Sequence, residues 1–484
     1  MPELMENILN NLKNDPNSLY SSALASRHWC KMSIPILWQN PFSFNKNPLF
    51  ISEYFSSLDE DEIYILKEYG INLKISRKLF NYAKFLKDLN LFDLESKAIR
   101  WINLNPVEPI TSITYVDALV NVVINLLLKL IFESGAVLHK LTLSCQNSFE
   151  FEPEIFYSIG RNELLFSRLQ HLYLSVIPEF SIENVTKFLK VLAKNITTIN
   201  SLDLTIYSDF DPRLFHTLFH AIIRIIKSQD QLKWFSLDGK GHHLKELHGV
   251  ISALECQKNT LQEVIINNCT YNKEFEVLKD CKNLETLRIF EAVEFIRFFI
   301  PKDFDDIHKV LFFLKALKSF CPNITYLNIQ YIDFSIQLLE LIGNLQKLQF
   351  LSLWCLIDDN IQEEELKVHV IQFAQILPLT LQYLDLGNTW EPYIDILLSH
   401  CNAPLKKLLI YHLNDEKYTR ALIEFCIRNK DLNYVGIYKY SDLDENFRQE
   451  VETHVTNVAL VPCARANIRV AEVLETDGVV YFEM

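Results

Sequence analysis

Residues 381–386 read Leu-Gln-Tyr-Leu-Asp-Leu, and residues 348–353 read Leu-Gln-Phe-Leu-Ser-Leu. Both hexads follow the pattern apolar-x-x-apolar-x-apolar. Because side chains alternate along a β-strand, the fourth and sixth positions point to one face while the third and fifth point to the other. The hexad therefore predicts a short strand that buries one of its two faces.

The same hexad occurs eleven times between residues 138 and 437, with helical periodicity between the copies, for example over 182–192, 214–226 and 310–317. First positions are separated by 23 to 40 residues, about 29 on average, which is typical of a repeat array. They are Leu138, Leu169, Ile199, Leu232, Leu261, Leu284, Ile324, Leu348, Leu381, Leu405 and Leu432. Since one strand–helix unit cannot bury its apolar face alone, the pattern predicts a stack of units around a parallel sheet.

These hexads resemble the leucine-rich-repeat family over residues 138–440. The resemblance implies an α/β solenoid with a curved parallel sheet on its concave side. The family places Asn or Cys nine positions into the motif to hydrogen-bond the turn, and here only Cys269 fits. We therefore expect irregular repeats whose turns are satisfied in another way.

The N-terminal segment predicts three short helices, over residues 2–13, 18–24 and 27–38. Leu4, Ile8 and Leu12 form an apolar stripe at helical spacing. Below roughly 40 residues a unit seldom folds without a partner or a staple. Apolar faces exposed on so small a unit are therefore expected to be an interface.

This segment resembles the F-box over residues 1–42. The family pattern is a Leu-Pro opening, a helix with Ile-Leu spacing, a second helix ending in Ser-Arg-x-Trp, and a closing Leu-Trp. Here Met1-Pro2-Glu3 stands for the opening, Ile8-Leu9 for the first helix, Leu24-Ala25-Ser26-Arg27-His28-Trp29 for the second, and Leu37-Trp38 for the close. The departures are Met1 in place of the leucine and the small Ala25.

The two resemblances together imply the substrate-recognition subunit of an SCF-type cullin ubiquitin ligase. The F-box would dock to a Skp-type adaptor, and through it to cullin, while the repeats would bind a protein substrate. Trp29 is an equally good candidate for a residue that packs between the helices and holds them together. By analogy the adaptor contacts would be Pro2, Leu4, Ile8, Leu12, Leu24 and Trp38. Two alternatives remain: a non-catalytic repeat scaffold or binding protein acting outside ubiquitination, and N-terminal helices that merely cap the repeats.

Two further segments flank the repeats. Residues 43–137 predict a helical connector, in which the acidic run 59–62 is expected to be a solvated face and the apolar stretch 122–132 a buried helix too short to span a membrane. Residues 441–484 predict a C-terminal cap.

Composition restricts the class of protein. The chain has 484 residues with 47 Lys and Arg against 61 Asp and Glu, a net charge of −14, which argues against nucleic-acid and membrane-surface binding. Its 10 cysteines are scattered without a CxxC pair, as expected of free thiols in a reducing compartment. The N-terminus lacks the basic and apolar regions of a signal peptide, so we expect a cytoplasmic or nuclear protein.

No motif predicts catalysis, a cofactor or a metal. His216 and His220 have the spacing of two zinc ligands, but the segment His-Thr-Leu-Phe-His lacks the glutamate of a His-Glu-x-x-His motif. Gly239 and Gly241 lack the third glycine of a dinucleotide turn, and no Gly-x-Ser-x-Gly elbow is present. We expect a non-catalytic protein.

Aromatic side chains in the later repeats predict the substrate surface. With positions one, four and six buried, positions three, five and seven face the concave side of the sheet. In the later repeats these positions carry Tyr326, Phe350, Trp354, Tyr383, Tyr411, Tyr434 and Tyr438. An exposed aromatic band usually marks a binding surface. The alternatives are that position-three aromatics pack sideways on their neighbours, or that the C-terminal tail covers them.

Overall fold

The computed structural model describes fifteen stretches of the chain, and the elements fall into two compact units, residues 1–257 and 258–484. The described residues are 2–13, 15–43, 48–73, 80–105, 113–145, 149–177, 181–207, 212–240, 247–269, 273–290, 314, 323–356, 361–411, 416–437 and 445–460. Apart from Leu314, the predicted helix over 310–317 lies outside them, as does most of the predicted C-terminal cap.

The first unit begins with the three predicted helices: α1 (Pro2–Asn11), α2 (Pro16–Ala25) and α3 (Arg27–Leu37). Side chains of Asp15 and Ser26 cap α2 and α3 by accepting hydrogen bonds from backbone N–H groups of the first helical turn. Leu9, Leu19 and Ile36 form the small core between them. The three-helix prediction is confirmed, with α2 starting two residues earlier than expected.

An aromatic cluster fastens this three-helix module to the segments that follow it. These are η1 (Pro41–Ser43), η2 (Pro48–Phe50), α4 (Ile51–Phe55), α5 (Glu60–Glu68) and η3 (Tyr82–Phe85). The Trp38 ring stacks on Tyr82 with 4.1 Å between centroids and also contacts Phe50 and Tyr54. Burial raises the pKa of Tyr82 above its ordinary value, as expected for a phenol inside such a cluster.

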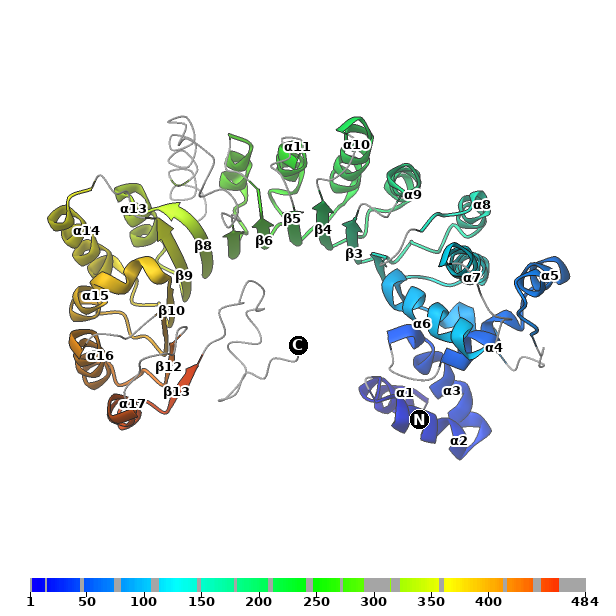
Figure 1. Cartoon of the computed structure of the whole chain (residues 1–484), viewed down its shortest axis with the longest axis horizontal. Helices are drawn as coiled ribbons and strands as arrows, with labels where there is room; N and C mark the ends of the chain where they lie inside the picture. Colours follow the sequence, from blue (N-terminus) through cyan, green and yellow to red (C-terminus); the bar gives the residue numbers. More distant parts are fainter. Residues whose placement is uncertain are drawn as a thin grey trace. The chain divides into compact units, whose positions relative to one another are not determined.

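The strands of the first unit form a parallel sheet in chain order: β1 (Asp88–Asn90), β2 (Lys140–Leu143), β3 (His171–Val176), β4 (Ser201–Tyr207) and β5 (Trp234–Lys240). The helices between them are α6 (Leu91–Leu104), α7 (Ile113–Glu133), α8 (Pro153–Arg161), α9 (Ile182–Asn195), α10 (Pro212–Ser228), α11 (Leu247–Ser252) and η4 (Ala253–Gln257). These helices follow one face of the strands (Figure 1).

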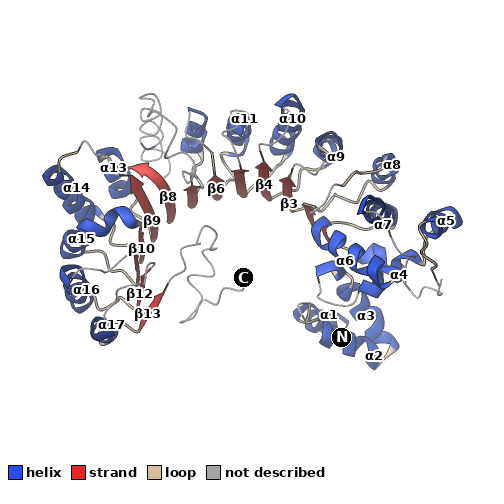
Figure 2. Cartoon of the chain, viewed as in Figure 1, coloured by secondary structure: helices blue, strands red, loops and turns tan. Residues whose placement is uncertain are grey.

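The second unit repeats this arrangement with β6 (Glu263–Asn267), β7 (Thr286–Phe290), β8 (Tyr326–Asp333), β9 (Phe350–Leu356), β10 (Tyr383–Leu386), β11 (Lys407–Ile410), β12 (Tyr434–Ile437) and β13 (Asn457–Leu460), again parallel and in chain order. Its helices are η5 (Lys273–Asp280), α13 (Ile336–Asn344), α14 (Glu363–Ile376), η6 (Asn388–Tyr393), α15 (Ile394–His400), α16 (Glu416–Arg428) and α17 (Glu445–Glu452). Figure 2 separates helices and strands by colour in both units. The fold is α/β, of the leucine-rich-repeat type.

All eleven predicted hexads coincide with a strand, from β2 to β12. Their first, fourth and sixth side chains are at most 3% exposed in every repeat, so the predicted strand register is confirmed throughout. In β10, for example, Leu381 and Leu384 are completely buried. We call the side of each sheet that points away from the helices its open face.

The sheet starts earlier than predicted. β1 pairs in parallel with β2, with Leu89 opposite Leu141, inside the segment that was expected to be a helical connector. Leu86, Leu89 and Leu91 form a further hexad, which lies 52 residues before Leu138 and was therefore outside the expected spacing. Val455, Val458 and Leu460 form another at the C-terminal end, where β13 pairs with β12.

The three-helix module continues directly into this sheet. In the hexads that begin at Leu86, Leu138, Leu169 and Ile199, the second-position carbonyl accepts two N–H groups from the segment that leads into the next strand; Lys87 O, for example, accepts from His139 N at 2.8 Å and Lys140 N at 3.2 Å. Gln39 O does the same for Lys87 N and Asp88 N, at 2.9 and 3.1 Å. Gln39, which follows Trp38, therefore supplies the backbone acceptor beside the first strand of the sheet, β1.

Amide side chains take the place of the missing turn asparagines. Gln257 Nε2 donates to Ile226 O at 2.9 Å and Gln229 O at 2.8 Å, while its Oε1 accepts from Leu232 N at 3.3 Å. Gln229 forms the equivalent set one repeat earlier, and Asn162 and Asn429 also donate to backbone carbonyls of the preceding repeat. Cys269 Sγ donates to Asn267 O at 3.3 Å, as expected of its position.

Helix α7 is the only helix among the described residues that is long and apolar enough, over Tyr115–Glu133, to cross a membrane by length and composition alone. Its packing is that of a core helix: Val123, Leu127 and Ile131 are completely buried against α6 and α8. Asn125 Nδ2 donates to Glu150 O at 2.9 Å, and Asn125 Oδ1 accepts from Glu152 N at 3.0 Å.

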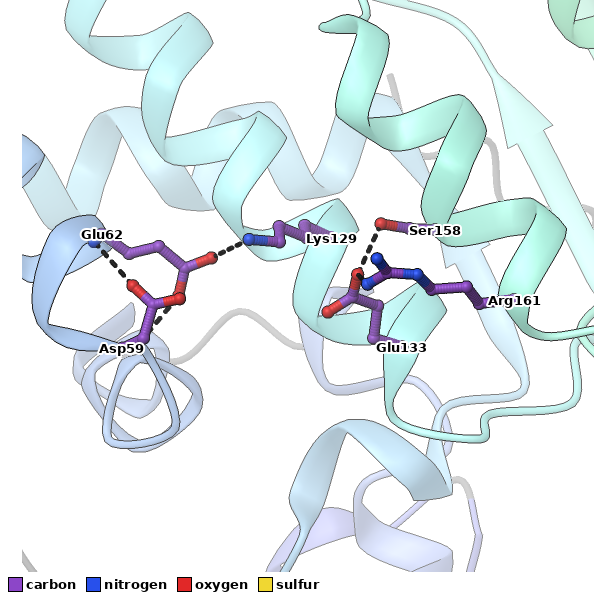
Figure 3. A network of polar contacts seen from close by, with 6 residues as sticks. All are labelled: Asp59, Glu62, Lys129, Glu133, Ser158 and Arg161. Carbon is purple, nitrogen blue, oxygen red and sulfur yellow. Dashed lines mark hydrogen bonds and ion pairs between the residues drawn. The ribbon is translucent and has the colours of Figure 1, made fainter.

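Ion pairs attach α7 to its neighbours (Figure 3). Asp59 and Glu62 form a capping box at the start of α5, and Glu62 also accepts a charged hydrogen bond from Lys129 of α7, which raises the pKa of Lys129. Glu133 accepts from Ser158 Oγ at 2.8 Å and pairs with Arg161 at 3.3 Å, both on α8. The prediction that residues 59–62 are simply a solvated face was wrong for Glu62, which is buried because it joins two helices.

Candidate protein-interaction site

The open face of the second unit carries a stacked row of aromatic rings. Tyr326, Phe350 and Tyr383 occupy the third position of the hexads that form β8, β9 and β10, and they are direct partners in the strand register. Ring centroids lie 3.9 Å apart for the first pair and 3.7 Å for the second, with interplanar angles of 13° and 12°. Neighbouring strands lie about 4.8 Å apart, so flat rings at equivalent positions meet face to face.

These three rings are not the exposed band that the sequence predicted. Each is only 5–7% exposed, and Leu409 of β11, packed against them, is 1% exposed. The sideways packing that was kept as an alternative describes Tyr326, Phe350 and Tyr383. The stacking covers both faces of the central ring and leaves mainly ring edges toward the open face.

Trp354 and Tyr411, at the seventh position of their repeats, are half-buried and pack against the aromatic row. Their rings meet edge to face with 6.5 Å between centroids. The ring of Trp354 lies over Gly387, where a Cβ would stand 2.8 Å from the indole Cγ. Tyr434 is also half-buried, with Lys407 Nζ 6.0 Å from its ring centroid. Tyr438 lies outside the described residues.

A row of small polar side chains lies beside the aromatic row and was missed by sequence reasoning. Asn328, Ser352 and Asp385 occupy the fifth position of the hexads that form β8, β9 and β10, and they are partners in the strand register. Ser352 Oγ donates to Asp385 Oδ2 at 2.9 Å. Asn328 is 8% exposed, and within the described part of the chain its Oδ1 accepts no hydrogen bond. A signal was available, because three consecutive hexads carry a small polar residue two places after an aromatic one.

Opposite charges surround this face. The guanidinium carbon of Arg288 lies 4.4 Å above the Tyr326 ring centroid, and its Nη2 lies 3.7 Å from Glu263 Oε1. Burial raises the pKa of Tyr326 to about 12, opposed by Arg288 and by a side-chain hydrogen bond with Asn328. Arg288 of β7 and Lys407 of β11 are balanced by Asp385 of β10 and by Glu263 of the adjacent β6, so the charges at and beside this face sum to zero.

The open face of the first unit is more polar. Its third positions are occupied by Lys140 and His171, both exposed, then by Ser201 and Trp234, both half-buried. No comparable aromatic row is described there. The candidate site for a protein partner is therefore the open face of β7–β11.

The predicted adaptor contacts divide into two groups. Ile8 and Leu24 are exposed, 47% and 71%, on α1 and α2, and Tyr20 of α2, which was not predicted, is 55% exposed. Leu12 packs instead against the core of the module, together with Trp29. The side chains of Pro2 and Leu4 lie outside the described residues.

Trp38 was wrongly predicted to contact the adaptor. Its ring is buried between Tyr82, Phe50 and Tyr54. The physical reason is that the chain after Trp38 folds back to start the repeats, so that the indole becomes part of the junction.

The two histidines of α10 are exposed, with 4.5 Å between the ring centroids of His216 and His220. Within the described stretches no group of three or more His, Cys, Asp or Glu side chains is placed to hold a metal ion.

No protein-family model matches the chain, and no curated protein matches it by sequence. Similar solved structures include the Rad7 and Elc1 complex in yeast, at TM-score 0.39 and 13% identity over 71% of this chain and 81% of that one. The TLR13–ssRNA13 complex follows at 0.24 and 13%, over 63% of this chain and 35% of that one. A leucine-rich-repeat protein of Leptospira interrogans gives 0.23 and 14%, over 69% and 86%. Similarities this low carry no inference about partners.

Proposed function

We propose that this protein is the substrate-recognition subunit of an SCF-type cullin ubiquitin ligase. Its N-terminal module would dock to a Skp-type adaptor, and the open face of the second unit would bind a protein substrate. The chain itself would be non-catalytic and would act in the cytoplasm, the nucleus or both.

The observation that carries the proposal is the exposure of large apolar side chains on a module with very little core. Ile8, Tyr20 and Leu24 are exposed on α1 and α2, whereas the core cluster among the described side chains of the three helices consists of Leu9, Leu19 and Ile36. Exposed aliphatic side chains on so small a unit are expected at an interface. The order of residues that resembles the F-box pattern supports a Skp-type adaptor as the partner.

The junction after α3 supports the same role. Because Gln39 O joins the first strand and Trp38 lies in the aromatic cluster, the module is fixed to the first repeats without a flexible linker. A rigid attachment would hold a bound adaptor in one orientation relative to those repeats. That is useful to a receptor that must present its substrate to a second enzyme.

The test is co-purification of the full chain with a purified Skp-type adaptor and with cullin. Ile8→Asp combined with Leu24→Asp should abolish adaptor binding, because each buried, unpaired carboxylate costs several kcal/mol. Both side chains are exposed in the free protein, so its thermal unfolding should not change. Leu379→Asp, at a 73% exposed leucine of the second unit, is the matched control.

Three results would separate the alternatives. Adaptor binding that survives the double substitution would refute the F-box role and leave the N-terminal helices as a cap. Adaptor binding without cullin would indicate a scaffold that acts outside ubiquitination. Adaptor and cullin together, both lost in the double variant, would support the ligase receptor.

A further inference from the structure

Helices α9 and α10 of the first unit are basic, although the chain as a whole is acidic. Together they contain six Lys and Arg and a single Glu, a net charge of +5, which leaves −19 for the remaining residues of a chain at −14. Five exposed side chains of these helices form what we call the basic strip. They are Lys187, Lys190, Lys194, Arg224 and Lys227.

The basic strip is one continuous surface. Its members on each helix are spaced by three or four residues, so each set lies on one helix face. The two helices pack side by side (Figure 1) and follow register-paired strands at the same distance, which places Lys194 at the position equivalent to Arg224. Along the helix axis the strip extends from Lys187 to Lys227, about 15 Å. His216 and His220 are exposed on the same face of α10.

No member of the basic strip forms an ion pair with another residue that the structure describes. Even Glu183, the acid of α9, stands one turn before Lys187 without pairing with it. Lys367 of α14 and Arg420 of α16, by contrast, pair with glutamates of their own helices. The charges of the strip are therefore not neutralised by the fold around them.

This arrangement costs stability. Like charges three and four residues apart on a helix repel each other, and equivalent positions of α9 and α10 add repulsion between the helices. A partner that brings carboxylates to the strip removes this repulsion when it binds, and complementary charge also speeds the encounter.

The side chains around the cations favour one class of anionic partner. Phe188, Phe215 and Phe219 are buried, so they offer no ring on which a nucleobase could stack. Among the described side chains of these two helices no large apolar one is exposed, as insertion into a lipid surface would require. Four of the five members are lysines, which lack the planar fork with which arginine binds phosphate. Carboxylates of a protein segment fit these features.

The size of the basic strip sets the length of that segment. An extended chain advances about 3.3 Å per residue, so about five residues cover the strip. A nucleic-acid duplex or a lipid surface presents negative charge over a much larger area and would meet the rest of the protein, which is net negative. A short acidic segment avoids that repulsion.

We propose that the basic strip of α9 and α10 is a docking surface for a short segment of a partner protein that is rich in Asp and Glu. The inference goes beyond the proposed function, because it requires neither the adaptor, nor cullin, nor the open face of the second unit.

The probe is a fluorescent peptide of about six glutamates, long enough to cover the strip, titrated onto the full chain and followed by fluorescence anisotropy. Contacts between exposed charges are weak, so the expected dissociation constant is roughly 0.1–1 mM at low salt. Binding should weaken several-fold as the salt concentration rises to about 0.15 M. A peptide of the same length made of glutamines should not bind, which tests the charge without altering the protein.

Lys190→Gln, Lys194→Gln and Lys227→Gln combined should weaken glutamate-peptide binding about ten-fold. Replacing the same three lysines by arginine keeps the charge and should retain binding. All three side chains are exposed, so neither variant should change the unfolding temperature.

The matched control removes the same charge from the second unit. It combines Lys282→Gln, Lys406→Gln and Lys430→Gln, at three exposed lysines. Its affinity for the peptide should equal that of the wild type. An equal loss in the two glutamine variants would reduce the effect to net charge and overturn the proposal, as would failure of the wild type to bind the peptide at low salt.

Two further results would assign the basic strip to another occupant and also overturn the proposal. One is tighter binding of duplex DNA or of anionic lipid vesicles than of the peptide, lost in the strip glutamine variant. The other is self-association in sedimentation experiments that this variant alone abolishes, which would indicate a second copy of the chain. Adaptor co-purification affects none of these results, so failure here is distinguishable from failure of the ligase role.

Discussion

The indole of Trp354 lies across Gly387, the residue that follows the neighbouring strand β10, so close that a Cβ at position 387 would stand 2.8 Å from its Cγ and 2.9 Å from its Cδ2. Gly387 has φ −71°, an ordinary backbone conformation, so glycine is required there by space and not by the backbone. The absence of one methyl group lets the ring lie beside the polar row and reach Tyr411.

Gly387→Ala is expected to destabilise the second unit by about 1–3 kcal/mol, because the ring must move out of a packed position. Denaturant unfolding followed by tryptophan fluorescence measures both the loss and the altered environment. Trp354→Ala should remove most of the penalty in the double variant. Gly160→Ala, in a helix with nothing within 4 Å of the new Cβ, is the control and should be neutral or slightly stabilising. Equal effects at both glycines would contradict the close contact.

In β10, substitution of an inward-facing residue and of an outward-facing residue should both reduce the stability of the fold. Leu384→Ala removes a completely buried side chain and is expected to cost about 2–5 kcal/mol. By strand alternation its neighbour Asp385 points outward, and substitution of an exposed residue there would change stability little. In the structure, however, Asp385 is buried and accepts a hydrogen bond from Ser352. Asp385→Ala should therefore cost about 1–3 kcal/mol, less when combined with Ser352→Ala. A cost for Asp385→Ala within about 0.5 kcal/mol would place that side chain in solvent.

The amides between repeats should carry stability that no hydrophobic pattern reveals. Gln257→Leu leaves the N–H of Leu232 and the carbonyls of Ile226 and Gln229 without this partner, so we expect a loss of about 3 kcal/mol or more. Urea unfolding of the full chain measures it. Gln170→Leu, at an exposed second position, should change stability little. If the two variants are equally stable, the turn-satisfying role of Gln257 is refuted.

The protein should lose stability at alkaline pH because the unfolded chain deprotonates at Tyr326 before the folded chain does. Its folded pKa of about 12 exceeds that of an unfolded tyrosine, about 10, so above the latter pH the unfolded chain releases a proton that the folded chain keeps. The stabilising effect is complete below about pH 10 and is lost as the pH rises toward about 12, by up to roughly 2–3 kcal/mol. Tyr326→Phe keeps the stacked ring and removes the proton. The stability of this variant relative to wild type should therefore rise across that interval, and a constant difference would show that the phenol is not buried.

The sequence by itself determined the strands. The hexads predict which side chains are buried, because burial of one strand face follows from the local alternation of side chains. All eleven hexads lie in the sheet with the predicted register. It also determined the three N-terminal helices, whose caps and breaks are local. The two missed strands, β1 and β13, carry the same hexad: Leu86 stands 52 residues before Leu138, outside the expected spacing, whereas Val455 stands 23 residues after Leu432, within it.

Only the tertiary structure decided which aromatic and polar side chains are available. Tyr326 and Tyr383 alternate outward like any exposed strand residue, but their burial depends on a ring contributed by a strand some thirty residues away. Trp38 became a junction residue because the chain folds back on it, and Glu62 became buried because Lys129 lies on another helix. Hydrophobic periodicity records a single chain segment, whereas stacking, ion pairing and an orphaned amide such as Asn328 are set by what neighbouring repeats place beside it.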